Sequence, residues 1–274
     1  MSNRGGSSTA VQVPKFAPVV PPQALRKLCR MGYRCTYLLV LAHDVVEQSR
    51  EWEKVINEGL LSGTFIILDN SLVELGKPAS TAMMSQAQDI IGANVAVLPD
   101  YLGNAKKTLR HSKRAAGNWN HDECLQDIPY MGVVQGETHD EAMDCARCLL
   151  EIPNVHFLAI PRHMCITLGS RVKITQEVSQ LVSNLHLLGF SDDLSDDMAT
   201  AHLPGVMGID SAVPLRLAYQ SVSMVRNPLA DAGRRGNFWD VAKDPNNVTP
   251  LWYHNALWMG DLLQSNDWNS LISG

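Results

Sequence analysis

Seven short runs of aliphatic residues recur along the chain, and they constrain its fold more than any other feature. The runs are Tyr37–Leu41, Phe65–Leu68, Val95–Leu98, Met131–Val134, Val155–Ile160, Leu185–Leu188 and Val206–Ile209. Runs this short and this continuously apolar are typical of parallel strands buried on both faces. Between them lie stretches with helical spacing, which are Val45–Glu58, Ala79–Ile91, His139–Leu150 and Ile174–Ser183. The alternation predicts repeated strand–helix units around a parallel sheet.

Seven or eight such units in 274 residues favour a closed (β/α)8 TIM barrel over an open doubly wound sheet. The weak run Ser221–Arg226 is the candidate for the eighth strand. No GxGxxG or Walker pattern follows the early strands, which argues against dinucleotide-binding and P-loop folds. We predict a flexible arm rich in Ser, Gly and Pro at residues 1–24 and a single barrel domain at residues 25–274.

Within that domain a short helix is expected at Gln23–Met31 and a final helix at Leu251–Leu263. Two segments are expected to be loops, His111–Asp127 and the Gly- and Asn-rich stretch Asn227–Asn247. The second is long enough to be functional.

Composition limits the partners that such a domain can have. The formal net charge of −5 argues against an indiscriminate nucleic-acid binder, although it allows a local basic face. No apolar run reaches the roughly 18 residues of a membrane span, and the N-terminus lacks a signal-peptide pattern. Six cysteines show no disulfide-framework spacing, so we interpret them as reduced thiols in a cytoplasm.

Polar residues follow several of the predicted strands, where the mouth of a barrel would lie. They are Asp69, Asn70, Ser71 and Glu74 after the second run, Asp100 after the third, Gln135 after the fourth, Arg162 and His163 after the fifth, and Asp210 after the seventh. Carboxyl groups that share a partly buried mouth have their pKa values pushed apart, so one can stay ionised while another holds a proton. That division suits glycosidic chemistry with a carboxylate nucleophile.

Simpler explanations exist for each residue taken alone. An aspartate after a strand is often the N-cap of the next helix. A metal site is less favoured, because no His, Asp and Glu cluster has clear ligand spacing. His163 and His186 could be pocket residues or satisfied core histidines. Cys145 and Cys148 have CxxC spacing but lie in an amphipathic pattern without a second pair.

Six segments between about residues 64 and 216 carry a family resemblance in unbroken order. They are Leu68–Ser71, Val97–Asp100, Met131–Gly136, Phe157–Ile160, Leu185–Gly189 and Gly208–Pro214. The third resembles a "GIVQGG" motif and the last resembles "MFDCVLPTR", both of the tRNA-guanine transglycosylases. These enzymes are TIM barrels that exchange guanine for a 7-deazaguanine.

The resemblance implies a role for each matching residue. Asp210 resembles the nucleophile that attacks the sugar C1′ and holds the nucleic acid covalently, and Asp69 resembles the general acid/base. The residues that would bind the base are Asp100, Gln135, Ala159, Ile160, Asn70 and Ser71. The first two would read its Watson–Crick-like edge, the next two would contact its far side through backbone amides, and the last two belong to an altered stacking wall.

The chain also departs from the family. The tRNA enzymes bind structural zinc through a C-terminal CxCxxC and a later histidine, whereas this chain has no cysteine after Cys165. We therefore predict no metal and no cofactor. The branch that fits best is the phage 7-deazaguanine DNA transglycosylases, which implies DNA and a free 7-deazaguanine base such as preQ0 as partners, and the host cytoplasm as the location.

A base inside a duplex must be flipped out or presented in single-stranded DNA, and the backbone needs local positive charge. The candidate nucleic-acid-binding residues are Lys106, Lys107, Arg110, Lys113, Arg114, Arg234 and Arg235. A solvated helix face is the simpler explanation of the first five. Three other functions stay open: a tRNA enzyme without zinc, a noncatalytic transglycosylase-like subunit that binds nucleic acid, and an unrelated barrel hydrolase or lyase.

Overall fold

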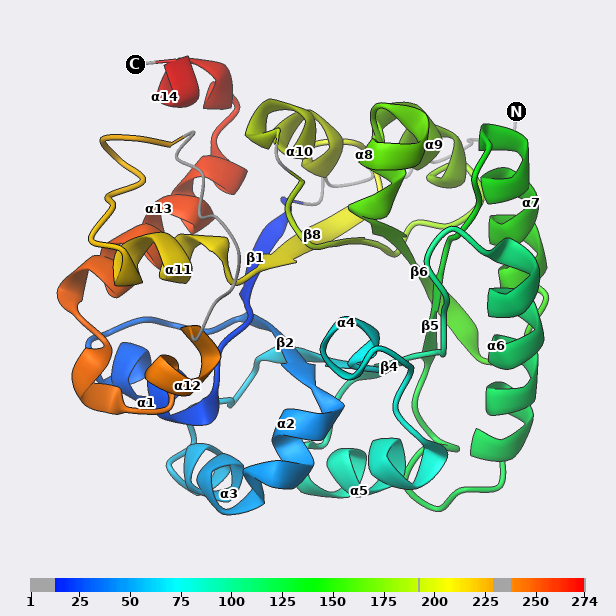
Figure 1. Cartoon of the computed structure of the whole chain (residues 1–274), viewed down its shortest axis with the longest axis horizontal. Helices are drawn as coiled ribbons and strands as arrows, with labels where there is room; N and C mark the ends of the chain where they lie inside the picture. The colour runs from blue at the N-terminus through cyan, green and yellow to red at the C-terminus, as the bar shows by residue number, and fades with distance from the viewer. Residues whose placement is uncertain (1–12, 192, 229–237, 274) are drawn as a thin grey trace, which may run out of the picture.

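Eight parallel strands form a nearly closed barrel in the computed structural model, which describes residues 13–191, 193–228 and 238–273 (Figure 1). The strands are β1 (Lys15–Pro18), β2 (Tyr37–Leu41), β3 (Phe65–Asp69), β4 (Val95–Val97), β5 (Tyr130–Val133), β6 (Val155–Pro161), β7 (Leu185–Leu188) and β8 (Val206–Ser211). Their hydrogen-bonded order is β1-β8-β7-β6-β5-β4-β3-β2, and β1 contacts β2 at the remaining seam. The predicted (β/α)8 TIM barrel is confirmed, with the seven predicted strands within two residues of their expected bounds.

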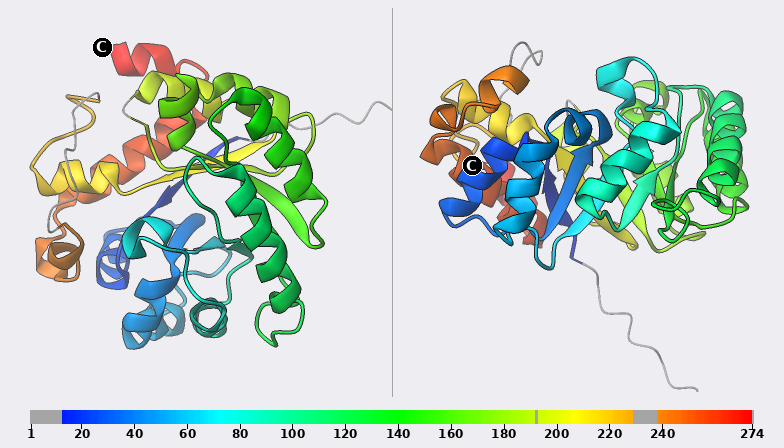
Figure 2. Two further views of the ribbon diagram at one scale, coloured as in Figure 1. Left: turned by 45° about the vertical axis from the view of Figure 1, so that its right-hand side comes forward. Right: turned by 90° about the horizontal axis from the view of Figure 1, so that it is seen from below.

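Most helices surround the strands on the outside, whereas the short α4 lies over the middle of the ring in Figure 1 (Figures 1 and 2). They are α1 (Pro22–Arg30), α2 (Ala42–Glu47), α3 (Ser49–Asn57), α4 (Leu72–Leu75), α5 (Thr81–Ile91), α6 (Ala105–Trp119), α7 (His139–Leu150), α8 (His163–Leu168), α9 (Val172–Val178), α10 (Leu194–Ala201), α11 (Val213–Tyr219), α12 (Phe238–Ala242), the 3-10 helix η1 (Pro245–Asn247), α13 (Pro250–Gln264) and α14 (Trp268–Ser273). Of the described helices, none has the length and apolar character that a membrane crossing requires.

The N-terminal segment corrects two predictions. The arm expected at residues 1–24 is wrong from Lys15 onward, because Lys15–Pro18 forms β1 and pairs with β8, with Ala17 opposite Asp210. In Figure 1, β1 (dark blue) lies along β8 (yellow). The weak run Ser221–Arg226 is not a strand. Strand β1 was missed because its four residues, which follow Pro14 and end at Pro18, are too few to show an apolar period. Pro18 has no N–H to donate, which is typical of a strand that pairs on one side only.

The loop predicted at His111–Asp127 is also wrong in its first half. Helix α6 continues to Trp119, because Ser112, Ala115 and Ala116 form its buried face together with the indole of that residue. The basic side chains that obscured this face in the sequence lie on the opposite, exposed side. Of the second predicted loop, residues 238–242 form α12 and residues 245–247 form η1, while residues 229–237 lie outside the described part of the chain.

Two apolar layers hold the barrel. A smaller one fills its interior and includes Ala17, Leu39, Ile67, Met131 and Ala159, whereas a larger one lies between the strands and the helices. Gly208 of β8 marks the tightest approach between strands, since a Cβ there would lie 2.2 Å from the Lys15 carbonyl oxygen and 2.7 Å from the Tyr37 ring. Only glycine fits this position, and its missing side chain leaves room for the ring of Tyr37.

Candidate active site

A cavity of about 300 Å³ opens at the carboxyl ends of the strands, where TIM barrels carry their active sites. Four acidic side chains line it, which are Asp69, Glu74, Asp100 and Asp210. They come from the ends of β3, β4 and β8 and from α4, the short helix that follows β3. The three aspartates that the strand-end pattern singled out therefore share one cavity, as predicted.

Asp210 is held through one of its two carboxylate oxygens. Its Oδ1 accepts a hydrogen bond from the Gly189 N–H at 2.9 Å and lies 3.0 Å from Nε2 of His186. Within the described part of the chain, Oδ2 has no hydrogen-bond partner. The side chain is only 11% exposed, and Asp210 faces the cavity. A carboxylate with one oxygen anchored and the other directed to a ligand space is suited to act as a nucleophile.

His186 connects Asp210 to a tyrosine in the barrel interior. The Tyr37 hydroxyl lies 2.9 Å from Nδ1 of His186, and both residues are fully buried or nearly so. Burial, and then the charge of Asp210, raises the pKa of the Tyr37 phenol well above its usual value. Tyr37 is therefore a neutral phenol at any ordinary pH. The sequence offered His186 as a pocket or core residue, and it lies directly behind the candidate nucleophile.

Asp69 has the opposite electrostatic environment. Burial raises its pKa well above the usual value, and the neighbouring carboxylates of Glu74, Asp100 and Asp210 raise it further. One hydrogen bond opposes this shift, from the Ser71 N–H to Oδ2 at 2.7 Å. Asp69 consequently retains a proton to higher pH than an ordinary aspartate does, which is the property of a general acid.

Asp100 is satisfied on both oxygens by side-chain amides. Nδ2 of Asn70 donates to Oδ1 at 2.9 Å, and Nε2 of Gln135 donates to Oδ2 at 2.7 Å. Burial raises the pKa of Asp100, and these two hydrogen bonds oppose the rise. Oε1 of Gln135 accepts the Gly103 N–H at 2.9 Å, so this amide is engaged at both ends. Asn70 and Gln135 position Asp100 in this structure.

The predicted base-binding residues divide into two groups. Asp100 and Asn70 line the cavity, whereas Gln135, Ser71, Ala159 and Ile160 do not. The Ala159 carbonyl accepts the Val134 N–H within the barrel wall, and the Ile160 carbonyl accepts a hydrogen bond from Arg171. At the end of β6 the cavity is instead lined by Pro161, Arg162 and His163. The far side of a bound ligand would meet the three residues that follow Ile160, rather than Ala159 and Ile160 themselves.

Part of the rim of the cavity is apolar, which the sequence did not indicate. Val73 of α4, Leu102 of the loop before α6 and Ile166 of α8 are 58%, 54% and 78% exposed, and all three line the cavity. They come from three separate strand–helix connections. Exposed apolar side chains of this size beside the acidic groups favour a ligand with an apolar surface.

Helix α6 carries the predicted basic face. Its exposed cations are Lys106, Lys107, Arg110, Lys113 and Arg114, and none of them forms an ion pair with a carboxylate in the described ranges. Nζ of Lys107 lies 3.7 Å from the ring centroid of Tyr101, which directly follows Asp100. The face therefore begins beside the cavity. Arg234 and Arg235 lie outside the described residues.

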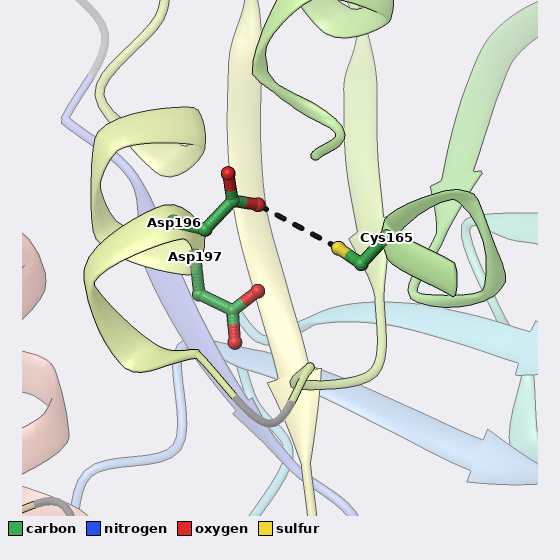
Figure 3. A group of neighbouring side chains, drawn as sticks. All are labelled: Cys165, Asp196 and Asp197. Carbon is green, nitrogen blue, oxygen red and sulfur yellow. Dashed lines mark hydrogen bonds between the residues drawn. The ribbon is translucent and has the colours of Figure 1, made fainter. Parts of the chain in front are cut away.

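Among the described residues, one group of possible metal ligands lies between α8 and α10 (Figure 3). Cys165, Asp196 and Asp197 approach one another there, but each is already engaged. Arg171 forms a fully buried ion pair with Asp197, and the Cys165 thiol donates to Asp196 at 3.6 Å. Burial raises the pKa of Cys165 to about 11, so the sulfur keeps its proton and is a poor ligand. The group is best explained as an ion-pair network that joins these helices.

The chemistry of the cavity has to be interpreted from its own geometry. No protein-family model matches this chain, and no curated protein matches it either. One anchored carboxyl group, one carboxyl group with a raised pKa and a buried aspartate held by two amides share a space large enough for a single heterocycle. This arrangement can perform nucleophilic displacement with proton transfer to the leaving group.

The raised pKa of Asp69 predicts a pH-dependent effect on stability. The unfolded pKa is about 3.9, so the folded protein binds this proton more tightly and loses stability as pH rises through the interval between the two values. Asp69→Asn removes this cost. We expect the variant to unfold at a higher temperature at pH 7, by about 2–4 °C for each 1 kcal/mol gained, and the gain to vanish near pH 3. The exposed Asp127→Asn is the control, and an equal gain at both pH values would contradict the assignment.

Proposed function

We propose that this protein is a base-exchanging transglycosylase that replaces guanine in DNA with a 7-deazaguanine through a covalent intermediate on Asp210. The observation that carries the proposal is the contrast between two carboxyl groups on one cavity. Asp210 is anchored by hydrogen bonds to one oxygen, whereas Asp69 is driven toward its protonated form by burial and neighbouring charge. A nucleophile and an acid on one leaving group need this contrast.

In the first half of the reaction, a carboxylate lone pair of Asp210 attacks the sugar C1′. The bond between C1′ and N9 of guanine breaks, and its electron pair goes to the departing base. Asp69 donates its proton to that base, which leaves as neutral guanine. The products are a glycosyl ester on Asp210 and an ionised Asp69.

The second half reverses these steps with a different base. The ionised Asp69 removes the N9 proton of the incoming 7-deazaguanine. N9 attacks C1′, the ester bond to Asp210 breaks, and its electron pair returns to the carboxylate. Asp69 ends protonated and Asp210 ionised, so the enzyme is restored without a cofactor in either half.

The size and surroundings of the cavity support a nucleic-acid substrate. A space of about 300 Å³ is at the small end of ligand sites and accommodates one base but not a base pair. The target nucleotide would therefore be flipped out or single-stranded, and the apolar rim of Val73, Leu102 and Ile166 would cover its faces. The α6 cations would bind the backbone beside the mouth. We propose that exchange occurs in the cytoplasm.

An RNA acceptor is the second candidate, because the cations of α6 would bind either backbone. A noncatalytic subunit is a weaker alternative, since binding alone would not require carboxyl groups with opposed protonation. The decisive experiment is an exchange assay with purified protein, labelled preQ0 or guanine, and separate DNA and tRNA acceptors. Label in DNA alone supports the proposal, label in tRNA alone assigns the tRNA reaction, and label in neither contradicts base exchange.

Substitution of the nucleophile gives the first prediction from this mechanism. Asp210→Asn keeps the shape of the side chain but removes the attacking charge, so exchange should fall by about a thousandfold or more. The unfolding temperature should change little by comparison, which separates chemistry from folding. Exchange that persists in this variant would show that Asp210 is not the nucleophile.

The basic face gives a prediction for binding. Lys106→Ala with Arg110→Ala should weaken DNA binding and lower the slope of log affinity against log salt by about 1 for each phosphate that is no longer neutralised. The matched control is Arg50→Ala with Lys173→Ala, which removes two exposed cations from α3 and α9. Equal slopes for the two double variants would mean that α6 is only a solvated face.

A further inference from the structure

We infer that His186, held in one tautomer by Tyr37, is a positioning residue that determines which oxygen of Asp210 attacks the sugar. The inference rests on the proposed function and adds to it two side chains that the family resemblance does not include. Three elements meet at this point. Tyr37 comes from β2, His186 from β7 and Asp210 from β8.

The Tyr37 hydroxyl has a single hydrogen-bond acceptor among the described residues. Nδ1 of His186, at 2.9 Å, is the sole hydrogen-bond partner of this hydroxyl in the described part of the chain. The tyrosine ring is otherwise packed on Phe65, with ring centroids 5.6 Å apart. Because the hydroxyl is buried, leaving its proton unpaired is unfavourable. Tyr37 therefore donates, and Nδ1 accepts without a proton of its own.

The other ring nitrogen must then carry the imidazole proton. Nε2 lies 3.0 Å from Oδ1 of Asp210, where two lone pairs would repel each other. With a proton on Nε2, every contact is satisfied: Tyr37 donates to Nδ1, and Nε2–H donates to Asp210. A doubly protonated ring would require Tyr37 to accept, and its own proton would be left without a partner. Among the described residues, the titratable groups that contact the His186 ring are Tyr37 and Asp210.

With this tautomer, the two carboxylate oxygens of Asp210 have different roles. Oδ1 receives two donors, from His186 and from the Gly189 N–H, and is thereby held away from the cavity. Oδ2 is left to form the bond to C1′. In the ester, Oδ1 becomes the carbonyl oxygen and keeps both donors. They stabilise the carboxylate again as it leaves in the second half-reaction, so His186 assists the step in which Asp210 departs.

The tautomer can be measured without any assay of activity. In protein labelled with ¹⁵N in its histidine rings, NMR should show a protonated Nε2 and an unprotonated Nδ1 for His186 between pH 6 and 8. The signal is assigned by its loss in His186→Gln. Tyr37→Phe should shift both nitrogens, because Nδ1 loses its donor. A proton on Nδ1 in the unaltered protein would overturn the inference, whether or not base exchange occurs.

A kinetic test examines the role itself. His186→Leu should slow the single-turnover reaction by about a hundredfold, as loss of one positioned donor does elsewhere, and leave the KM for the free base within about twofold. His186→Gln restores an N–H toward Asp210 and should recover at least tenfold. Tyr37→Phe should also slow the single-turnover reaction, because Nδ1 loses the donor that fixes the tautomer.

Tyr130→Phe is the control, because Tyr130, at the start of β5, also has a buried ring, but its hydroxyl donates to Asn120 and it does not line the cavity. Equal losses of activity in Tyr37→Phe and Tyr130→Phe would mean that the Tyr37 hydroxyl has only a packing role, and would contradict the inference. The predicted tautomer without exchange into any acceptor would instead contradict the proposed function. Exchange with the other tautomer would contradict the inference alone.

Discussion

The ladder between β1 and β8 is the interaction on which the rest of the site depends. It covers β8 on the side away from β7 and places Ala17 opposite Asp210. Gly208, two residues earlier, admits both the Lys15 carbonyl and the ring of Tyr37 at distances that no side chain would allow. The same close approach brings the Tyr37 hydroxyl to His186, and His186 to Asp210. A four-residue strand thus controls the environment of the candidate nucleophile.

Three aspartates share one cavity but are made chemically different by what touches them. Asp210 receives donors on one oxygen, which fixes its orientation. Asp100 receives a donor on each oxygen, from Asn70 and Gln135, and these oppose the effect of its burial. Asp69 is buried beside three acidic neighbours and has one backbone donor, and its burial and these charges raise its pKa. These differences are a property of the packed mouth rather than of any one residue.

Much of this arrangement could be predicted from the sequence, for a physical reason. Strands buried on both faces are almost continuously apolar, so seven of eight were evident. Parallel strands end at one edge, so the residues after them, including Asp69, Asp100 and Asp210, were expected to converge. Strand β1 escaped because four residues between prolines show no period. The first half of the predicted loop after residue 110 was wrong because charged residues masked the buried stripe of α6.

Other parts could not be predicted, because they depend on contacts between distant segments. Tyr37 and His186 are 149 positions apart, and no local sequence pattern shows that the two side chains meet beside Asp210. Ala159 and Ile160 belong to the right strand but do not line the cavity, which begins at Pro161, the last residue of β6. The apolar rim arises because three connections expose Val73, Leu102 and Ile166 at one place. Exposure of that kind is set by tertiary packing and has no periodic pattern.

The proposed mechanism depends most directly on a covalent bond between Asp210 and a sugar. The measurement that tests it is mass spectrometry of the protein after incubation with guanine-containing DNA, without free base, followed by denaturation and digestion of both polymers. The mechanism predicts a nucleotide remnant on the peptide that contains Asp210. A remnant on another residue, or none after base release has been detected, would contradict it.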